Sequence, residues 1–231
     1  MTTLRALNRL AYPGEHVRVH AVITAEILEG QHPIRAWEYS QALYALQTWD
    51  VDYVPDVARI ADVGGAGSQF YRTLRARHAT ASIDVVDPDL ATPDGQRGIV
   101  HGLLPGATAV KFTLAEWSGY AQNVAAYDAV FCLSVIEHVE DPQAFVQQLC
   151  SLVRPGGLLV LTCDAGETAV DTYHFHWMRR WIPDSLALER LQVALYAQGF
   201  RRLGAPPDFT YQGPTVFDYA VASIAVVREG L

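Results

Sequence analysis

The sequence predicts an α/β protein whose sheet is mostly parallel and is covered by helices on both faces. Over residues 57–227, short apolar runs alternate with amphipathic stretches, as in repeated strand–helix units. The first apolar run, 57–63, ends in a turn rich in glycine (Gly64, Gly65 and Gly67), and glycine lets a backbone turn sharply and approach a ligand closely. This arrangement is typical of nucleotide pockets in α/β proteins, although three glycines are also compatible with an ordinary turn.

The individual elements follow from periodicity and from the residues that interrupt it. Strands are expected at 57–63, 81–86, 109–112, 127–133, 158–162 and 217–227. Helices are expected at 21–28, 35–49, 69–78, 141–152 and 186–198. Pro142 suits the first turn of a helix, where its missing N–H costs little, and Gly199 is a usual stop after a helix.

Composition excludes several classes of protein. The formal net charge is −8 and no run of lysine and arginine occurs, so an extended nucleic-acid surface is not expected. The first twenty residues lack an uninterrupted apolar stretch, so neither a signal peptide nor a membrane segment is expected there. The three cysteines, Cys132, Cys150 and Cys163, lack CxxC spacing, which argues against a disulfide framework or zinc knuckle. We therefore expect a soluble, cytoplasmic protein without nucleic-acid or membrane partners.

Four segments, in order along the chain, carry a more specific pattern. They are ADVGGAGS at 61–68, IDVVDPD at 83–89, YDAVFCLSVIEHVEDP at 127–142 and LVRPGGLLVLTCD at 152–164. Together they resemble the class I S-adenosylmethionine-dependent methyltransferases, with the pattern of methyltransferase type 11 and ubiquinone-biosynthesis enzymes. The resemblance implies a Rossmann-like, doubly wound sheet of seven strands, with helices on both faces and S-adenosyl-L-methionine as the cofactor.

The resemblance covers residues 57–231, which we expect to form the methyltransferase domain. Residues 1–56 lie outside it and are expected to form a helical N-terminal extension that covers the active site. Arg35, Trp37 and Glu38 in this extension could line the substrate site, but packing with a surface ion pair is the favoured interpretation.

The resemblance also implies which residues bind the cofactor. Asp62 would anchor the glycine loop and contact the amino-acid end of the cofactor, whose ammonium needs negative charge. Gly64, Gly65 and Gly67 would let the loop pass beneath the adenosine. Asp87, at the tip of the second strand, could accept hydrogen bonds from both ribose hydroxyls because a carboxylate is an acceptor only. Asp62 and Asp87 as simple turn residues are the alternative.

Three further residues are assigned to the cofactor on the same basis. Leu133 would lie beside it through backbone and van der Waals contacts. Glu116 could accept from the adenine amino group, and Trp117 could stack on the adenine ring. A solvated Glu116 and a Trp117 that only packs against its neighbours are the alternatives.

The glycine turn departs from the family pattern and also from that of other nucleotide-binding families. Ala66 and Ser68 stand where related enzymes carry glycine. A nicotinamide-binding protein would need G-x-G-x-x-G, but Phe70 occupies the position of the last glycine. The chain contains neither GxxxxGK[ST] nor GxSxG, which argues against a nucleoside triphosphatase and a serine hydrolase.

Histidines are the candidate catalytic residues. His174 and His176 lie in a segment that caps the active site in the resembling enzymes, and either could remove a hydroxyl proton, since an unperturbed histidine titrates near neutral pH. His138 follows the fourth strand at the open edge of the expected pocket, but structural hydrogen bonding at the start of a helix is the favoured interpretation for it. Packing among Trp177 and Trp181 is the alternative for the first two, and no metal is expected there, although His-x-His can supply two ligands.

These observations predict a methyltransferase that acts on a small or medium-sized acceptor. The histidines favour an oxygen acceptor, such as a sugar or a secondary metabolite. The alternative is a non-catalytic, methyltransferase-like binding or interaction module. The sequence leaves open both a homodimer and the identity of the acceptor.

Overall fold

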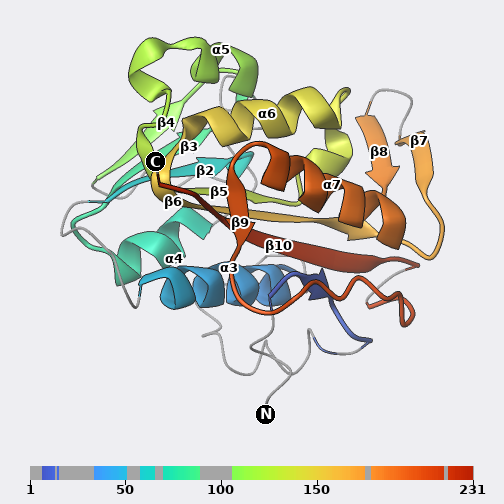
Figure 1. Ribbon diagram of the computed structural model, residues 1–231. Helices are drawn as coiled ribbons and strands as arrows, with labels where there is room; N and C mark the ends of the chain where they lie inside the picture. Colours follow the sequence, from blue (N-terminus) through green and yellow to red (C-terminus); the bar gives the residue numbers. More distant parts are fainter. Residues whose placement is uncertain are drawn as a thin grey trace.

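The fold is built on a central sheet of eight strands (Figure 1). The computed structural model describes residues 7–13, 15, 34–50, 58–65, 70–88, 106–174, 178–215 and 218–230. The strand order is β1-β10-β6-β5-β2-β3-β4, and β9 pairs with β10 beside this path. The α/β class is confirmed, with eight strands instead of the seven expected.

The middle of the sheet is parallel. Its strands are β2 (Arg59–Val63), β3 (Ser82–Val86), β4 (Ala107–Val110), β5 (Tyr127–Leu133) and β6 (Val153–Ala165). Every residue of β5 is buried, as expected for a strand covered on both faces. The chain leaves β2 toward one neighbour, β3, and later returns to the other side of β2 as β5. The carboxyl ends of β2 and β5 therefore flank the point where the strand order reverses.

One edge of the sheet is antiparallel. The predicted last strand is observed as β10 (Ala220–Arg228), which pairs with β6 along its length. Two short strands that the sequence did not predict, β1 (Arg9–Leu10) and β9 (Phe200–Arg202), pair with β10 in turn. Strands of two and three residues show no periodicity of their own, and only their pairing with β10 defines them.

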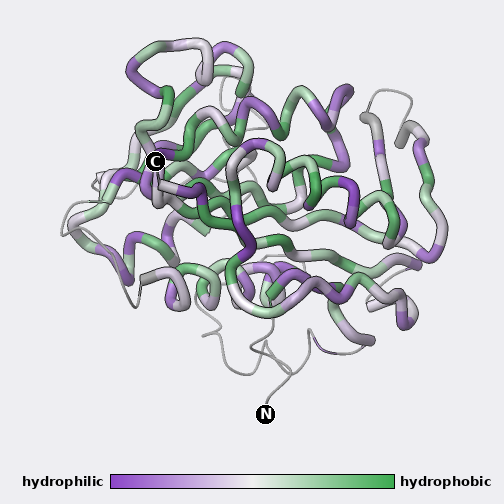
Figure 2. Tube along the Cα trace, viewed as in Figure 1, coloured by the Kyte–Doolittle hydropathy of each residue, from purple (hydrophilic) through white to green (hydrophobic). Residues whose placement is uncertain are grey.

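Helices cover both faces of the sheet (Figure 1). On one face lie α3 (Ile34–Asp50) and α4 (Phe70–Arg77), and on the other lie α6 (Pro142–Leu152) and α7 (Ser185–Ala197). The α6 helix begins as its sequence predicts, because the Asp141 side chain accepts from the Ala144 N–H and Pro142 occupies the first turn. Hydrophobic residues concentrate along the central strands between the two helical layers (Figure 2).

The N-terminal helix α3 packs into the same core as the sheet. Trp37 and Tyr39 are fully buried there together with Phe70 of α4 and Phe131 of β5. The helix expected at 35–49 is thus observed, whereas the one expected at 21–28 lies outside the described residues. The domain boundary at residue 56 also falls in a segment outside them and stays a prediction.

A β-hairpin follows β6, where the sequence predicted only a long segment over the active site. Its strands are β7 (Val170–His174) and β8 (Met178–Ile182), which pair antiparallel, with Val170 opposite Ile182. This hairpin forms a small separate sheet at one end of the molecule (Figure 1). Strand β8 lies against the short 3₁₀ helix η6 (Ile136–His138).

Among the described helices, none combines the length and the apolar character that crossing a membrane requires.

Candidate functional site

A cleft of about 650 Å³ opens where the carboxyl ends of β2, β3 and β5 meet. Its wall includes Gly64 after β2, Asp87 after β3, Val135 after β5 and His138 of η6. The first turn of helix α5 (Leu114–Gly119) closes one side. This is the crevice in which open α/β sheets bind ligands, at the point where the strand order reverses.

Gly64 is required by the geometry of the cleft floor. Its φ is +78°, and a Cβ built on it would lie 2.1 Å from Cγ2 of Val135. Its N–H donates to the carbonyl oxygen of Val86 at 2.8 Å, which fixes the turn against β3. Gly65 is also confined, since a Cβ there would lie 2.7 Å from Val85. Gly67 lies outside the described residues.

Asp62 places an uncompensated carboxyl group beneath this turn. Asp62 is 1% exposed, and its Oδ2 atom has no hydrogen-bond partner within the described part of the chain. Burial, with a smaller contribution from the Asp87 carboxylate, raises the pKa of Asp62 to about 7 against the opposing effects of a Tyr71 backbone hydrogen bond and Arg35. Asp62 is not among the lining residues of the cleft, and its contact with the amino-acid end of the cofactor stays a prediction.

Asp87 stands directly on the cleft wall. It follows the last residue of β3, and its N–H donates to the carbonyl oxygen of Val110 at 3.0 Å. This bond to the end of β4 holds the turn at the mouth of the cleft. Its assignment to the ribose hydroxyls stays a prediction, and so does the role of Leu133, which is buried at the end of β5.

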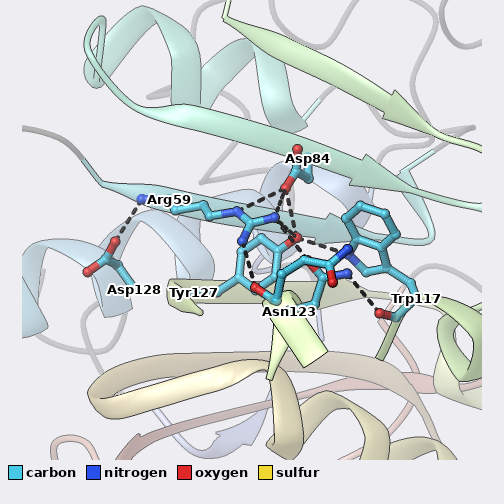
Figure 3. Close-up of polar contacts among 7 residues, drawn as sticks. Arg59, Asp84, Trp117, Asn123, Tyr127 and Asp128 are labelled. Atoms are coloured by element: carbon cyan, nitrogen blue, oxygen red, sulfur yellow. Dashed lines mark hydrogen bonds and ion pairs between the residues drawn. The ribbon is translucent and has the colours of Figure 1, made fainter. Parts of the chain in front are cut away.

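Glu116 and Trp117 lie on α5 but are engaged with the protein itself. The Glu116 carboxylate accepts from the N–H and hydroxyl of Thr113, at 2.9 and 2.8 Å, and these hydrogen bonds lower the pKa of Glu116. Trp117 Nε1 donates to the Tyr127 hydroxyl at 2.9 Å, which in turn donates to Asp84 at 2.7 Å (Figure 3). The indole also stacks on Phe112.

The cleft is lined instead by the residues just before these two. Thr113, Leu114 and Ala115 face it, while Glu116 and Trp117 are not among its lining residues. Whether Glu116 or Trp117 reaches the adenine stays a prediction. Thr113, Leu114 and Ala115 belong to no recognisable motif, so nothing in the sequence marked them as lining residues.

The three candidate histidines are placed differently. His138 is exposed in η6 and lines the cleft. His174 ends β7, where its backbone is paired with Met178, and His176 lies outside the described residues. In the described part of the chain, no three His, Cys, Asp or Glu residues are grouped as metal ligands.

A second polar group, which includes the Arg35 and Glu38 that the sequence offered as lining the substrate site, lies next to the cleft. The side chain of Glu38 on α3 is fully buried and accepts from the hydroxyls of Ser134 and Thr162. It also pairs with Arg35 at 2.8 Å. The surface ion pair favoured from the sequence is therefore wrong: this pair is buried on the glutamate side and reaches the carboxyl ends of β5 and β6.

Two more buried carboxyl groups extend this edge toward the hairpin. Burial and then the charge of Asp164 raise the pKa of Glu137 well above its usual range. Burial raises the pKa of Asp164 to about 6, although Arg180 on β8 pairs with it at 3.3 Å and opposes the rise. The edge of the sheet that holds the cleft is therefore rich in carboxyl groups.

The fold and the site together define an α/β protein whose ligand cleft lies where the strand order of the sheet reverses, called the switch point. Open α/β sheets bind nucleotides in this position. The family model described as a methyltransferase domain matches residues 4–201, which is most of the chain. The chain thus belongs to the class I S-adenosylmethionine-dependent methyltransferases, as the sequence pattern indicated.

Curated relatives carry a more specific name. The chain is 33% identical over 108 residues to a ubiquinone biosynthesis O-methyltransferase of Leptothrix cholodnii, covering 46% of this chain and 44% of that protein. It is 33% identical over 127 residues to the protein of the same name from Xylella fastidiosa, covering 52% and 49%. The chain spans about half the length of the curated relatives it matches.

Solved structures share the fold at low identity. A 1,6-didemethyltoxoflavin-N1-methyltransferase of Burkholderia thailandensis superposes with a TM-score of 0.58 at 14% identity, covering 95% of this chain and 92% of that one. An S-adenosylmethionine-dependent methyltransferase of Leishmania major gives 0.56 at 11%, covering 92% and 82%. A structure described as the [4+2]-cyclase SpnF gives 0.54 at 15%, covering 83% of both chains.

Proposed function

We propose that this protein transfers the methyl group of S-adenosylmethionine to an oxygen atom of a small acceptor. The observation that carries the proposal is the cleft at the switch point, which brings Gly64 and Asp87 together above the buried Asp62. Membership of the family supports the cofactor, and the O-methyltransferase name of the curated relatives supports the acceptor atom.

The residues of the cleft fit this cofactor. The partnerless oxygen of Asp62 would balance the ammonium of its amino-acid end, and Asp87 would accept from the ribose hydroxyls. Gly64, which carries no side chain, lets Val135 pack directly against the turn at the floor of the cleft. When bound, the cofactor supplies an activated methyl group on a sulfonium, so the protein mainly has to align the acceptor and exclude water.

A hydroxyl acceptor must also lose its proton. Transfer forms the bond between oxygen and methyl carbon and breaks the bond between sulfur and that carbon, and the hydroxyl proton needs a base. His138 is the candidate that lines the cleft, and we assign it this role. The acceptor class is the sugar or secondary metabolite expected from the sequence.

A binding module without methyl transfer is the second candidate. The observation that favours it is the departure of the glycine turn from the family pattern at Ala66 and Ser68. A protein described as a [4+2]-cyclase also shares this fold. The fold alone therefore does not determine the reaction, and turnover has to be measured separately from cofactor binding.

The test uses the full chain in two steps. Calorimetric titration with S-adenosylmethionine and S-adenosylhomocysteine measures binding, and we expect both to bind. Transfer of a labelled methyl group to a panel of hydroxylated sugars and aromatic metabolites then measures turnover, with His138→Asn compared to the unaltered protein. Absence of binding of both ligands at about 1 mM, the weak end of specific affinities, would overturn the proposal. Binding without transfer to any acceptor would favour the module.

A further inference from the structure

Ser134, the first residue after β5, has an unusual backbone conformation. Its φ is +52°, in the left-handed region that residues other than glycine rarely adopt. Its N–H donates to both the carbonyl oxygen and the hydroxyl oxygen of Thr162, at 3.1 and 3.0 Å. A conformation of this kind persists only where its surroundings impose it.

The surroundings that impose it come from the N-terminal helix. Glu38 of α3 accepts from the hydroxyl of Ser134 and from that of Thr162 through the same oxygen, Oε1. Its other oxygen, Oε2, is paired with Arg35 at 2.8 Å. The same guanidinium nitrogen of Arg35 also donates to the carbonyl oxygen of Leu133 at 3.3 Å. Arg35 and Glu38, one turn apart on α3, thus both hold the end of β5. Arg35 donates to the carbonyl oxygen of Leu133, and Glu38 accepts from the hydroxyl of Ser134.

These contacts of Arg35 and Glu38 with Leu133, Ser134 and Thr162, which we call the clamp, lie directly behind the cleft. Ser134 and Val135 line the cleft, and Val135 occupies the space that a side chain at Gly64 would need. A rotation of Ser134 out of its left-handed conformation would shift Val135 relative to the glycine turn. Because Glu38 is fully buried, its hydrogen bonds are not shared with bulk water.

From this geometry we infer that Glu38 is a positioning residue for cofactor binding, acting through Ser134. The inference rests on the proposed function, because the ligand whose binding it sets is S-adenosylmethionine or its demethylated product. It assigns a role in the site to a helix outside the four segments that carry the family pattern.

The decisive test combines two substitutions in the full chain. In Glu38→Gln the carboxylate charge is lost, and with it the ion pair to Arg35. When the amide oxygen faces Arg35, the hydroxyls of Ser134 and Thr162 must accept from the amide nitrogen instead of donating to a carboxylate. We expect S-adenosylhomocysteine to bind about tenfold more weakly, as measured by calorimetry. Ser134→Gly supplies a residue that adopts positive φ without strain. If Glu38 acts through Ser134, it has little left to hold once residue 134 is glycine. In the Ser134→Gly background, Glu38→Gln should therefore change the affinity by less than about twofold, which is the error expected when independent effects are added.

A control on the same helix separates positioning from stability. Gln41 is buried on α3, and its Oε1 accepts from the hydroxyl of Ser223 on β10 at 3.4 Å; neither residue lines the cleft. Gln41→Met should shift the thermal midpoint but leave the affinity for S-adenosylhomocysteine unchanged. Hydrogen exchange at the Ser134 amide provides a readout that needs no ligand, and it should become faster in Glu38→Gln alone.

The outcomes separate the two proposals. Failure of the unaltered protein to bind would overturn the proposed function, and the inference about the cofactor with it. Binding by the unaltered protein, with an equal loss of affinity from Glu38→Gln in both backgrounds, would overturn the inference alone. Unchanged exchange at Ser134 in Glu38→Gln would overturn it as well.

Discussion

At the scale of single residues, the proposed site depends on two carboxyl groups near the carboxyl ends of β2 and β3. Asp62 is buried with one oxygen unpartnered, and Asp87 stands at the mouth of the same cleft. Unpaired buried charge is costly in a stable protein, so it is informative where it occurs. Two predictions follow from these two residues.

Asp87→Asn should weaken the binding of S-adenosylhomocysteine by about 1–3 kcal/mol, because asparagine offers one neutral acceptor oxygen in place of the two charged oxygens of a carboxylate. Calorimetric titration measures the change. Glu189→Gln, which removes a carboxylate from the exposed side of α7, is the matched control and should bind normally. Equal affinities of Asp87→Asn and the control would show that Asp87 does not hold the ribose.

Asp62 should make stability depend on pH. Its pKa is raised by burial to about 7 in the folded protein, against about 4 in an unfolded chain. Between these values the folded state holds a proton that the unfolded state has lost, so the free energy of unfolding falls as pH rises through this window. Asp164 and Glu137, whose pKa values are also raised by burial, contribute in the same direction.

Comparison with Asp62→Asn isolates this contribution, because the asparagine cannot ionise. We expect the variant to gain stability relative to the unaltered protein at pH 8 and to gain much less at pH 5. Urea unfolding at the two pH values measures it. A stability difference that is the same at both would contradict a raised pKa.

At the scale of elements, helix α5 shows how a wall of the cleft is anchored. Its first turn lines the cleft, while Trp117 in its middle is hydrogen-bonded to Tyr127 of β5 (Figure 3). Tyr127 and Arg59 meet the same oxygen of Asp84 on β3. The network ties α5 to strands β2, β3 and β5 beneath it.

Trp117→Phe distinguishes an anchoring residue from one that stacks on adenine. An anchor loses stability, by about 0.5–1.5 kcal/mol, because the Tyr127 hydroxyl loses the Trp117 donor and keeps only that of Arg59. A stacking residue loses affinity for the cofactor instead. The contacts of the indole favour the first result. Thermal unfolding and calorimetric titration of the same variant decide between the two.

At the scale of the whole molecule, the N-terminal helix is part of the fold. Trp37 and Tyr39 of α3 lie fully buried against the same face of the sheet as α4. Burying one large apolar side chain contributes about 1.5–3 kcal/mol, and domains are stable by only about 5–15 kcal/mol. The loss of several such residues is therefore comparable to the total stability of the protein.

A fragment that starts at residue 57 should consequently fail to fold cooperatively. We expect it to lack a near-ultraviolet circular dichroism signal and a sharp thermal transition, whereas the full chain shows both. Cooperative unfolding of the fragment would instead support the boundary expected at residue 56 and an extension that only covers an independent domain.

The sequence by itself determined the repeated strand–helix units, the glycine turn and the identity of the family. These signals are local: the run at 127–133, the helix start at Asp141–Pro142 and the stop at Gly199 each depend on neighbouring residues. Because the carboxyl ends of parallel strands meet at one edge, the fold class also predicted that Gly64 and Asp87 would share a cleft.

Only the tertiary structure decided which side chains face that cleft and what holds them there. Glu38 and Ser134 lie far apart in sequence, and nothing local signals that a carboxylate on α3 reaches a hydroxyl after β5. Nor does any local signal show that Trp117 donates to the hydroxyl of Tyr127. Short-range periodicity specifies elements, whereas the partners of a buried polar group are set by packing between elements, and such partners cannot be inferred from the order of residues.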